Sequence, residues 1–216
     1  MEGDEEEVAK GEARDEPVVA EDERAKEEEL HIDFEKLREL KDLCLMRSVS
    51  QVVTFLRDPS VPPLLNANDP SDSKLLTPLH AGILSLSLPL VRLLVAHGAR
   101  ASVREGRGNN AFHLLSDLSI QPHLDRLSSE SHLLLDFLET LSSIDLSETH
   151  AALRETNNAL QTPLHVSLSS ASVVSLPFVH ALLHLGSDPL QPNAEVPFSP
   201  LSPLLSCTNT MNVRDD

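Results

Sequence analysis

The stretch TPLHAGILSLSLPLVRLLVAHGA, residues 77–99, decides the fold, because each of its parts favours one step in building a pair of short helices. Thr77 can cap the free N–H groups at a helix start. Pro78 suits the first helical position, where no N–H is needed. Leu79 is expected to turn inward, and Gly98 can adopt a positive φ where the second helix stops. The stretch therefore predicts two consecutive helices separated by a short break.

The same pattern returns further along the chain. TPLH occurs again at residues 162–165, and Gly186 follows that copy at a similar distance. A related segment, GNNAFHLLSDL, places His113 33 residues after the first histidine. FSPLSPLLS at 198–206 is a weaker copy with Ser202 in the place of the histidine. Helix pairs this short cannot bury their apolar faces alone, so neighbouring units are expected to stack.

Residues 32–56, IDFEKLRELKDLCLMRSVSQVVTFL, precede these copies and are helical in pattern. Phe34, Leu37 and Leu40 belong to a first apolar stripe, and a second stripe follows a break at RSVS. A serine in that break can cap the second segment. We therefore expect two short helices here, followed by the loop RDPSVPPLLNAND.

The two TPLH copies, the 33-residue step and the glycine spacing together resemble the ankyrin repeat family. The resemblance implies an all-α solenoid of stacked helix pairs joined by β-hairpin fingers, with about four repeats and a C-terminal stub. On this basis residues 31–216 form the repeat domain. Its expected parts are a divergent first repeat at 34–68, a second at 69–105, a third at 106–157, a fourth at 158–193 and a partial repeat at 194–216.

Three departures from the family pattern stand out. The third repeat carries about nineteen extra residues around SIQPHLDRLSSES and SSIDLSETHA, for which we expect a mobile loop, with HLLLDFLETL remaining the second helix. The fourth repeat carries about three extra residues near SSASVVSLP. The glycine that the family places before the threonine is replaced by Leu75 and Leu160.

Charge and composition exclude several classes of protein. The net charge is −17, and residues 1–29 hold fourteen acidic and four basic side chains. We expect residues 1–30 to form a disordered acidic tail, and binding to nucleic acid or to an anionic membrane is not expected. The two cysteines are too far apart in sequence for a metal motif or a disulfide framework. With no apolar run long enough for a membrane span, the chain is expected in the cytoplasm or the nucleus.

Ten histidines raise the question of metal or catalytic chemistry. The resemblance accounts for His80, His113 and His165, whose rings hydrogen-bond near helix starts. His180 and His184 share a helix face, but zinc needs a third ligand and Ala181 stands where a zinc protease has glutamate. No nucleotide-binding loop or nucleophile motif occurs. We therefore expect no catalytic residues, no metal and no cofactor.

The function that the resemblance implies is a non-catalytic scaffold that, as a monomer, binds a partner protein through its finger tips and concave helix face. An alternative is an adaptor or assembly-chaperone subunit of a larger complex, related to ubiquitin ligases or the proteasome; a metal-dependent enzyme is a distant third. Mapped onto this sequence, the family's contact positions are Asn68, Asp69, Leu84, Ser85, Arg104, Glu105, Arg107, Asp117, Arg154, Glu155 and Asn157.

One finger, ASVREGRGN, also concentrates positive charge in an acidic chain. Arg100, Arg104 and Arg107 lie within eight residues on or beside it. We hypothesise that the acidic tail transiently covers this positive spot. Exposed ion pairs contribute only about 0–1 kcal/mol each and are screened by salt, so such a contact would be loose.

Overall fold

The computed structural model describes residues 32–121, 128–143, 145–169 and 174–192, all within one compact unit that begins at Ile32. The expected acidic tail and C-terminal stub lie outside the described residues. Within these ranges the chain is all-α, with nine α-helices, a short 3-10 helix and no β-strand. The helices are α1 (Phe34–Leu45), α2 (Val49–Phe55), α3 (Pro78–Leu84), α4 (Leu88–Ala96), α5 (Ala111–Ser119), α6 (Ser128–Ser142), α7 (Leu146–Arg154), α8 (Pro163–Ser167) and α9 (Leu176–His184); the 3-10 helix is η2 (Pro62–Asn66).

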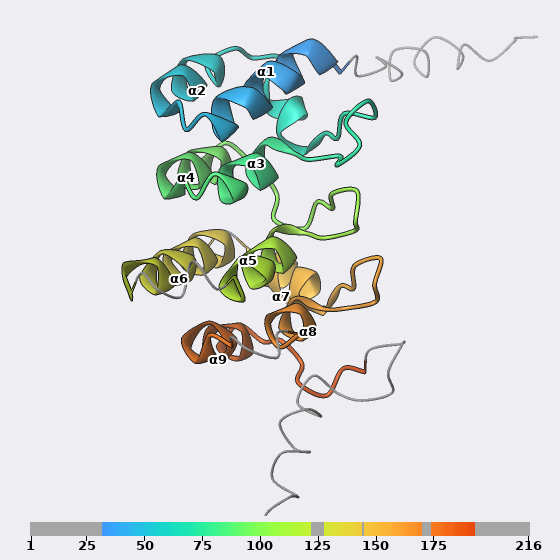
Figure 1. Cartoon of the computed structure of the whole chain (residues 1–216). Coiled ribbons are helices and arrows are strands. Elements are labelled where there is room, and N and C mark those ends of the chain that lie inside the picture. The colour runs from blue at the N-terminus through green and yellow to red at the C-terminus, as the bar shows by residue number, and fades with distance from the viewer. Residues whose placement is uncertain (1–31, 122–127, 144, 170–173, 193–216) are drawn as a thin grey trace, which may run out of the picture. The chain divides into compact units, whose positions relative to one another are not determined.

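The helices form two parallel rows (Figure 1). An inner row runs α1, α3, α5, α8 and an outer row runs α2, α4, α6, α9, with each helix packed on the next in its row. Each inner helix also packs on the outer helix that follows it. One additional helix, α7, lies in the connection between α6 and α8. The connectors that lead into α3, α5 and α8 project to the same side of the stack.

The three inner helices α3, α5 and α8 start in the same way. The side chains of Thr77, Asn110 and Thr162 each accept a hydrogen bond from the backbone N–H three residues later. That later residue is a histidine in every case, and its Nδ1 accepts from the N–H of the capping residue. The caps expected at the two threonines are confirmed, and Asn110 is a third cap that the sequence pattern did not single out.

Positive φ values recur at equivalent positions in the helix pairs. Gly98 and Gly186 have φ of 96° and 93° after α4 and α9, which confirms the expected positive φ. Two residues before each cap, Leu75, Gly108 and Leu160 also have positive φ, of 50°, 77° and 58°. Leu75 and Leu160 therefore hold a conformation that L-residues adopt at a cost of roughly 1–2 kcal/mol.

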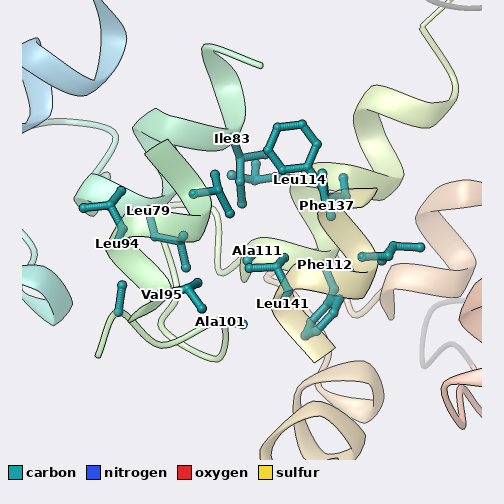
Figure 2. Packing of buried hydrophobic residues seen from close by; sticks show 14 of the residues in the cluster. Leu79, Ile83, Leu94, Val95, Ala101, Ala111, Phe112, Leu114, Phe137 and Leu141 are labelled. Atoms are coloured by element: carbon teal, nitrogen blue, oxygen red, sulfur yellow. The ribbon is translucent and has the colours of Figure 1, made fainter. Parts of the chain in front are cut away.

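One hydrophobic cluster runs through the stack. Leu79 and Leu164, which were expected to turn inward, are buried in it. In the close view, Leu79 and Leu94 come from the second helix pair, while Phe112 and Leu141 come from α5 and α6 (Figure 2). This cluster therefore crosses every interface between neighbouring helix pairs, while a second, smaller cluster of Leu37, Leu64 and Ala67 lies beside α1 and η2.

Two expectations about the connecting segments are wrong. The β-hairpin fingers are absent from the described ranges, where the connectors are closed by turns. The second half of the insert in the third repeat is the helix α7, because Asp145 caps it by accepting from the N–H groups of Ser147 and Glu148. The HLLLDFLETL segment lies in α6 as expected, and residues 122–127 lie outside the described residues.

Replacing Leu79 or Leu164 by alanine should destabilise the fold, because each side chain is fully buried between helices. We expect each change to lower the free energy of unfolding by about 2–5 kcal/mol, measured by urea denaturation. Leu146→Ala is the matched control, because that leucine is 64% exposed. A loss of only a few tenths of a kcal/mol at both buried sites would contradict the assignment of these positions to the core.

Candidate functional site

The turns before α3, α5 and α8 share one hydrogen-bond pattern. In each turn, the residue with positive φ donates its N–H to the carbonyl three residues earlier, at Asp72, Glu105 or Asn157. The side chain of that earlier residue then accepts from backbone N–H groups at the end of the turn. One polar side chain per turn therefore fixes the conformation of that turn. The main role of these side chains is to stabilise the fold.

Neighbouring turns are also bonded to each other. The N–H of Gly106 donates to the carbonyl of Lys74 at 2.7 Å, and the N–H of Asn158 donates to the carbonyl of Arg107 at 3.0 Å. Asn158 Nδ2 adds a bond to the carbonyl of Gly106 at 3.2 Å. The three turns thus form one continuous wall alongside the inner helices.

A groove of about 700 Å³ lies between this wall and helices α3, α5 and α8. Leu76, Leu84, Leu114 and Val166 supply its apolar lining, and the side chain of Leu84 is 41% exposed. A smaller pocket of about 300 Å³ against α1 shares Leu76 as a lining residue. The hollow surface therefore continues from α1 to α8.

The lining of the larger groove follows the repeat. Four positions in each unit can be counted from the cap residue. Two lie three residues and one residue before the cap, and two lie four and seven residues after it. In all three units these positions line the groove or the adjoining pocket. These are Lys74, Leu76, Ala81 and Leu84; Arg107, Asn109, Leu114 and Asp117; and Ala159, Gln161, Val166 and Ser169. Positions four and seven lie on one helix face, so a periodic set of side chains lines the whole groove.

Charges in the groove are divided between its two sides. Lys74 and Arg107 lie on the turn wall and Asp117 lies on α5, all three exposed. None of them forms an ion pair with another described residue. A ligand lying in the groove would therefore meet positive charge on the side of the turns and negative charge on the side of the helix.

Five of the contact residues expected from the sequence line this groove: Leu84, Glu105, Arg107, Asp117 and Asn157. Asn157 is also bonded within the wall, since its Nδ2 donates to Asn109 Oδ1 at 2.8 Å. Glu105 is buried, and its carboxylate accepts from the N–H of Asn109. Glu105 therefore shapes the groove more than it offers a contact.

The other six expected residues do not line the larger groove, although Asp69 lines the adjoining pocket against α1. Ser85 is buried and donates to the carbonyl of Gly82. Asp69 is buried and bonded to Arg38, whose guanidinium holds the pKa of the Asp69 carboxyl well below its usual range. Asn68 Nδ2 donates to the carbonyls of Leu75 and Arg104.

Arg154 and Glu155 end α7, and they lie away from the groove with Arg104. Arg104 Nε lies 3.4 Å from Glu155 Oε2. Arg100 is paired in the same way, with its Nε 3.3 Å from Glu148 Oε1. Of the three arginines in the expected positive spot, two therefore have an acidic partner in or beside α7, and Arg107 has none among the described residues. The acidic tail proposed to cover the spot lies outside the described residues.

Sequence reasoning missed Lys74, Leu76, Leu114, Val166 and Gln161 as lining residues. A signal was present, because each occupies one of the four repeating positions counted from a cap. The 33-residue step from His80 to His113 sets the register of the middle unit, so the same positions could have been counted in every unit.

Burial favours the neutral form of the histidine rings in the core. Burial lowers the pKa of both His80 and His113 to about 4, although a backbone hydrogen bond to each ring acts in the opposite direction. Burial likewise raises the pKa of the Cys44 thiol to about 12, so the nucleophilic thiolate is disfavoured. His180 and His184 stack edge to face, with ring centroids 4.4 Å apart.

The described residues hold neither a candidate metal centre nor a membrane-spanning helix. The described part of the chain contains no group of three or more His, Cys, Asp or Glu side chains placed to hold a metal ion. Among the described helices, none is long and apolar enough to cross a membrane. The groove is thus the site that combines repeating residues with exposed, unpaired charges.

Comparison of the chain with models of known protein families and with curated proteins found no match in either case.

Gly108 should tolerate alanine much less well than Gly98. Both have positive φ, but a Cβ at Gly98 would meet no atom within 4 Å, whereas one at Gly108 would overlap the side chain and backbone N of Asn158. We expect Gly98→Ala to lower the free energy of unfolding by about 1 kcal/mol and Gly108→Ala by about 2–4 kcal/mol. Equal losses in urea denaturation would show that the turn wall is not closely packed at Asn158.

Stability should fall as the pH drops from 6.5 toward 4. An unfolded histidine has a pKa of about 6.5, so between these values the unfolded chain binds more protons than the folded chain. The contribution of a buried neutral ring is therefore complete above pH 6.5 and declines below it. From pH 7.5 to pH 5 we expect a loss of about 1–2 kcal/mol for each of His80 and His113, measured by urea denaturation.

His80→Gln should reduce this pH dependence. Glutamine at the third helical position can keep the reciprocal cap but does not titrate. His180→Gln, which replaces an exposed ring in α9, is the control and should leave the slope close to that of the parent protein. An unchanged slope in His80→Gln would contradict the buried neutral ring.

Proposed function

We propose that the chain is an ankyrin-repeat protein and that it binds a partner protein, without catalysis, through the groove between the turn wall and helices α3, α5 and α8. The observation that carries the proposal is the periodic lining. Four positions per unit line one continuous groove. The remaining polar side chains of the turns form the hydrogen bonds that stabilise those turns.

The shape and chemistry of the groove suit a segment of polypeptide. Its length across three helix pairs and its open form suit an elongated ligand more than a compact small molecule. Leu76, Leu84, Leu114 and Val166 offer apolar contact, and Asn109 and Gln161 bring amide groups that can pair with peptide N–H and C=O groups. Lys74, Arg107 and Asp117 can discriminate between ligands by charge.

The rigidity of the wall supports the same proposal. Each turn is closed by its own side chain and bonded to its neighbour, so the lining side chains are presented from a fixed backbone. A preformed surface loses less conformational entropy on binding than a flexible one. Repeat proteins commonly use such extended concave faces for recognition, which makes a binding role the reading that best accounts for this architecture.

Substitutions in the groove should weaken partner binding while leaving the fold intact. We expect Leu84→Asp and Arg107→Glu each to reduce the recovery of specific partners at least tenfold, about 1.4 kcal/mol of binding free energy. The measurement is affinity purification with quantitative mass spectrometry, followed by titration of the purified partner. Circular dichroism and thermal unfolding of each variant establish that the fold is kept.

Matched controls are available outside the groove. Leu146→Asp changes an exposed leucine of α7, and Arg57→Glu reverses an exposed charge after α2. Both should retain binding within about twofold. If the groove variants and these controls recover the same partners in the same amounts, the groove is not the binding site.

A further inference from the structure

Charged side chains without an ion-pair partner lie on both sides of the groove and of the pocket that adjoins it. Lys74 and Arg107 lie on the turn wall, and both are exposed. On the helix side, Asp117 of α5 lines the groove and Asp42 of α1 lines the adjoining pocket, and both are exposed as well. None of these four forms an ion pair with another described residue. Two cations therefore lie on one side of the hollow surface and two carboxylates on the other.

The other aspartate, glutamate, lysine and arginine side chains that line this surface are already engaged. In the pocket against α1, Arg38 Nε lies 2.6 Å from Asp69 Oδ2, and Lys41 Nζ lies 2.9 Å from Asp72 Oδ2. In the groove, Glu105 is buried within its own turn. The four unpaired charges are therefore the ones that a ligand would meet.

The charges on each side are spaced by the repeat. Lys74 and Arg107 occupy the same position in successive turns, and α3 packs directly on α5. Packed helices lie about 8–10 Å apart, so these two cations are separated by about one such step. Asp42 and Asp117 lie on α1 and α5, with α3 packed between those helices. The two carboxylates are therefore separated by about two steps.

A polyproline II segment has a period that matches this spacing. It has three residues per turn and rises about 3.1 Å per residue, so every third side chain returns to the same face after about 9 Å. A β-strand returns to the same face after about 6.6 Å, which falls out of step with the helix pairs. The polyproline II backbone also has no internal hydrogen bonds. Its free peptide groups can pair with the amides of Asn109 and Gln161 in the groove.

We propose that the partner segment is a polyproline II stretch with a three-residue period, in which one residue of each triplet is acidic, one is apolar and one is basic. Two acidic side chains three positions apart contact Lys74 and Arg107 on the turn wall. Two basic side chains six positions apart contact Asp42 and Asp117 on the helices. The apolar residue of each triplet packs on the leucine lining of the groove. This inference names the class of partner and therefore rests on the proposed function.

The same division of charge selects against ligands of a single sign. A uniformly acidic segment would be attracted by Lys74 and Arg107 but repelled by Asp42 and Asp117, and a uniformly basic segment would meet the reverse. Residues 1–29 of this chain hold fourteen acidic and four basic side chains, so they are a poor match for this surface. The order of charges along the ligand, rather than its net charge, therefore determines recognition.

The test is an NMR titration of the full-length protein at low salt with three peptides of equal composition. One consists of three Glu-Pro-Lys triplets, and the second has the reverse order, because the segment can run in either direction. The third groups the same residues as three Glu, three Pro and three Lys. We expect one triplet peptide to bind at least tenfold more tightly than the grouped peptide and to shift amides of α1, α5 and the turns. This preference should shrink as added salt screens the charges.

Charge reversal on the helix side provides a matched pair of variants. Asp42→Lys should weaken binding of the preferred triplet peptide at least fivefold, because it replaces a carboxylate that contacts a basic side chain. Glu39→Lys makes the same change of charge on the same helix, at an exposed residue that lines a different hollow, between α1 and α2. It should bind the peptide within twofold of the parent protein. Circular dichroism and thermal unfolding establish that both variants keep the fold.

Equal binding of the triplet and grouped peptides would overturn the proposal, and so would an Asp42→Lys variant that binds like the parent protein. Tighter binding of a peptide in which glutamate replaces every lysine would assign a uniformly acidic partner and would overturn it as well. These results are distinguishable from failure of the groove as a binding site. If Leu84→Asp loses the partners recovered by affinity purification while Asp42→Lys keeps them, the groove binds protein and the order of charges is wrong.

Discussion

The stack depends on the reciprocal hydrogen bonds between each helix cap and the histidine three residues later. The cap side chain accepts from the histidine N–H, and the ring accepts from the N–H of the cap, so two backbone groups that a helix start leaves unpaired are satisfied locally. The other ring nitrogen, Nε2, is left for a contact outside its own helix. A histidine that helps to cap its own helix can therefore also form a hydrogen bond to the next unit, as His113 does to the carbonyl of Gln161.

Close approach of successive turns explains where glycine is required and where it is not. Gly106 lies against the backbone of Lys74, and Gly108 lies against Asn158, so each interface between turns has one glycine at its point of contact. In the first interface the glycine is supplied by the later turn, which leaves Leu75 free to keep a side chain despite its positive φ. The bond from the N–H of Leu75 to the carbonyl of Asp72 and the cap at Thr77 hold that conformation from both sides.

Those parts of the fold that depend on local chemistry could be predicted from the sequence. Thr77, Thr162, Gly98 and Gly186 act through their own backbone and side chain, and their expected roles are confirmed.

The candidate site could be predicted only in part. Leu84, Glu105, Arg107, Asp117 and Asn157 line the groove. Glu105 is nevertheless buried, as are Asp69 and Ser85, because their polar atoms bond inside the protein. A polar residue in a turn can face solvent or close the turn, and composition alone does not distinguish the two. The helix α7 was missed for a related reason, since Asp145 and Glu148 were taken as loop chemistry although an acid three residues after a cap is also a helix start.

The insertion that produces α7 also supplies partners for arginines of the preceding connector. Glu148 pairs with Arg100 and Glu155 with Arg104, so this helix supplies the acids for two of the arginines in the preceding connector. Asn110 Nδ2 further donates to the carbonyl of Ala152, which ties α7 to the cap of α5. Arg107 has no such partner, because the nearest acid in its own turn, Glu105, is turned inward to bond Asn109. The positive charge left on the turn wall is therefore confined to Arg107 and Lys74, which occupy the same position in two successive turns. The acids in and beside α7 thus pair with arginines outside the groove, while Arg107 and Lys74 stay unpaired among the described residues and available to a ligand.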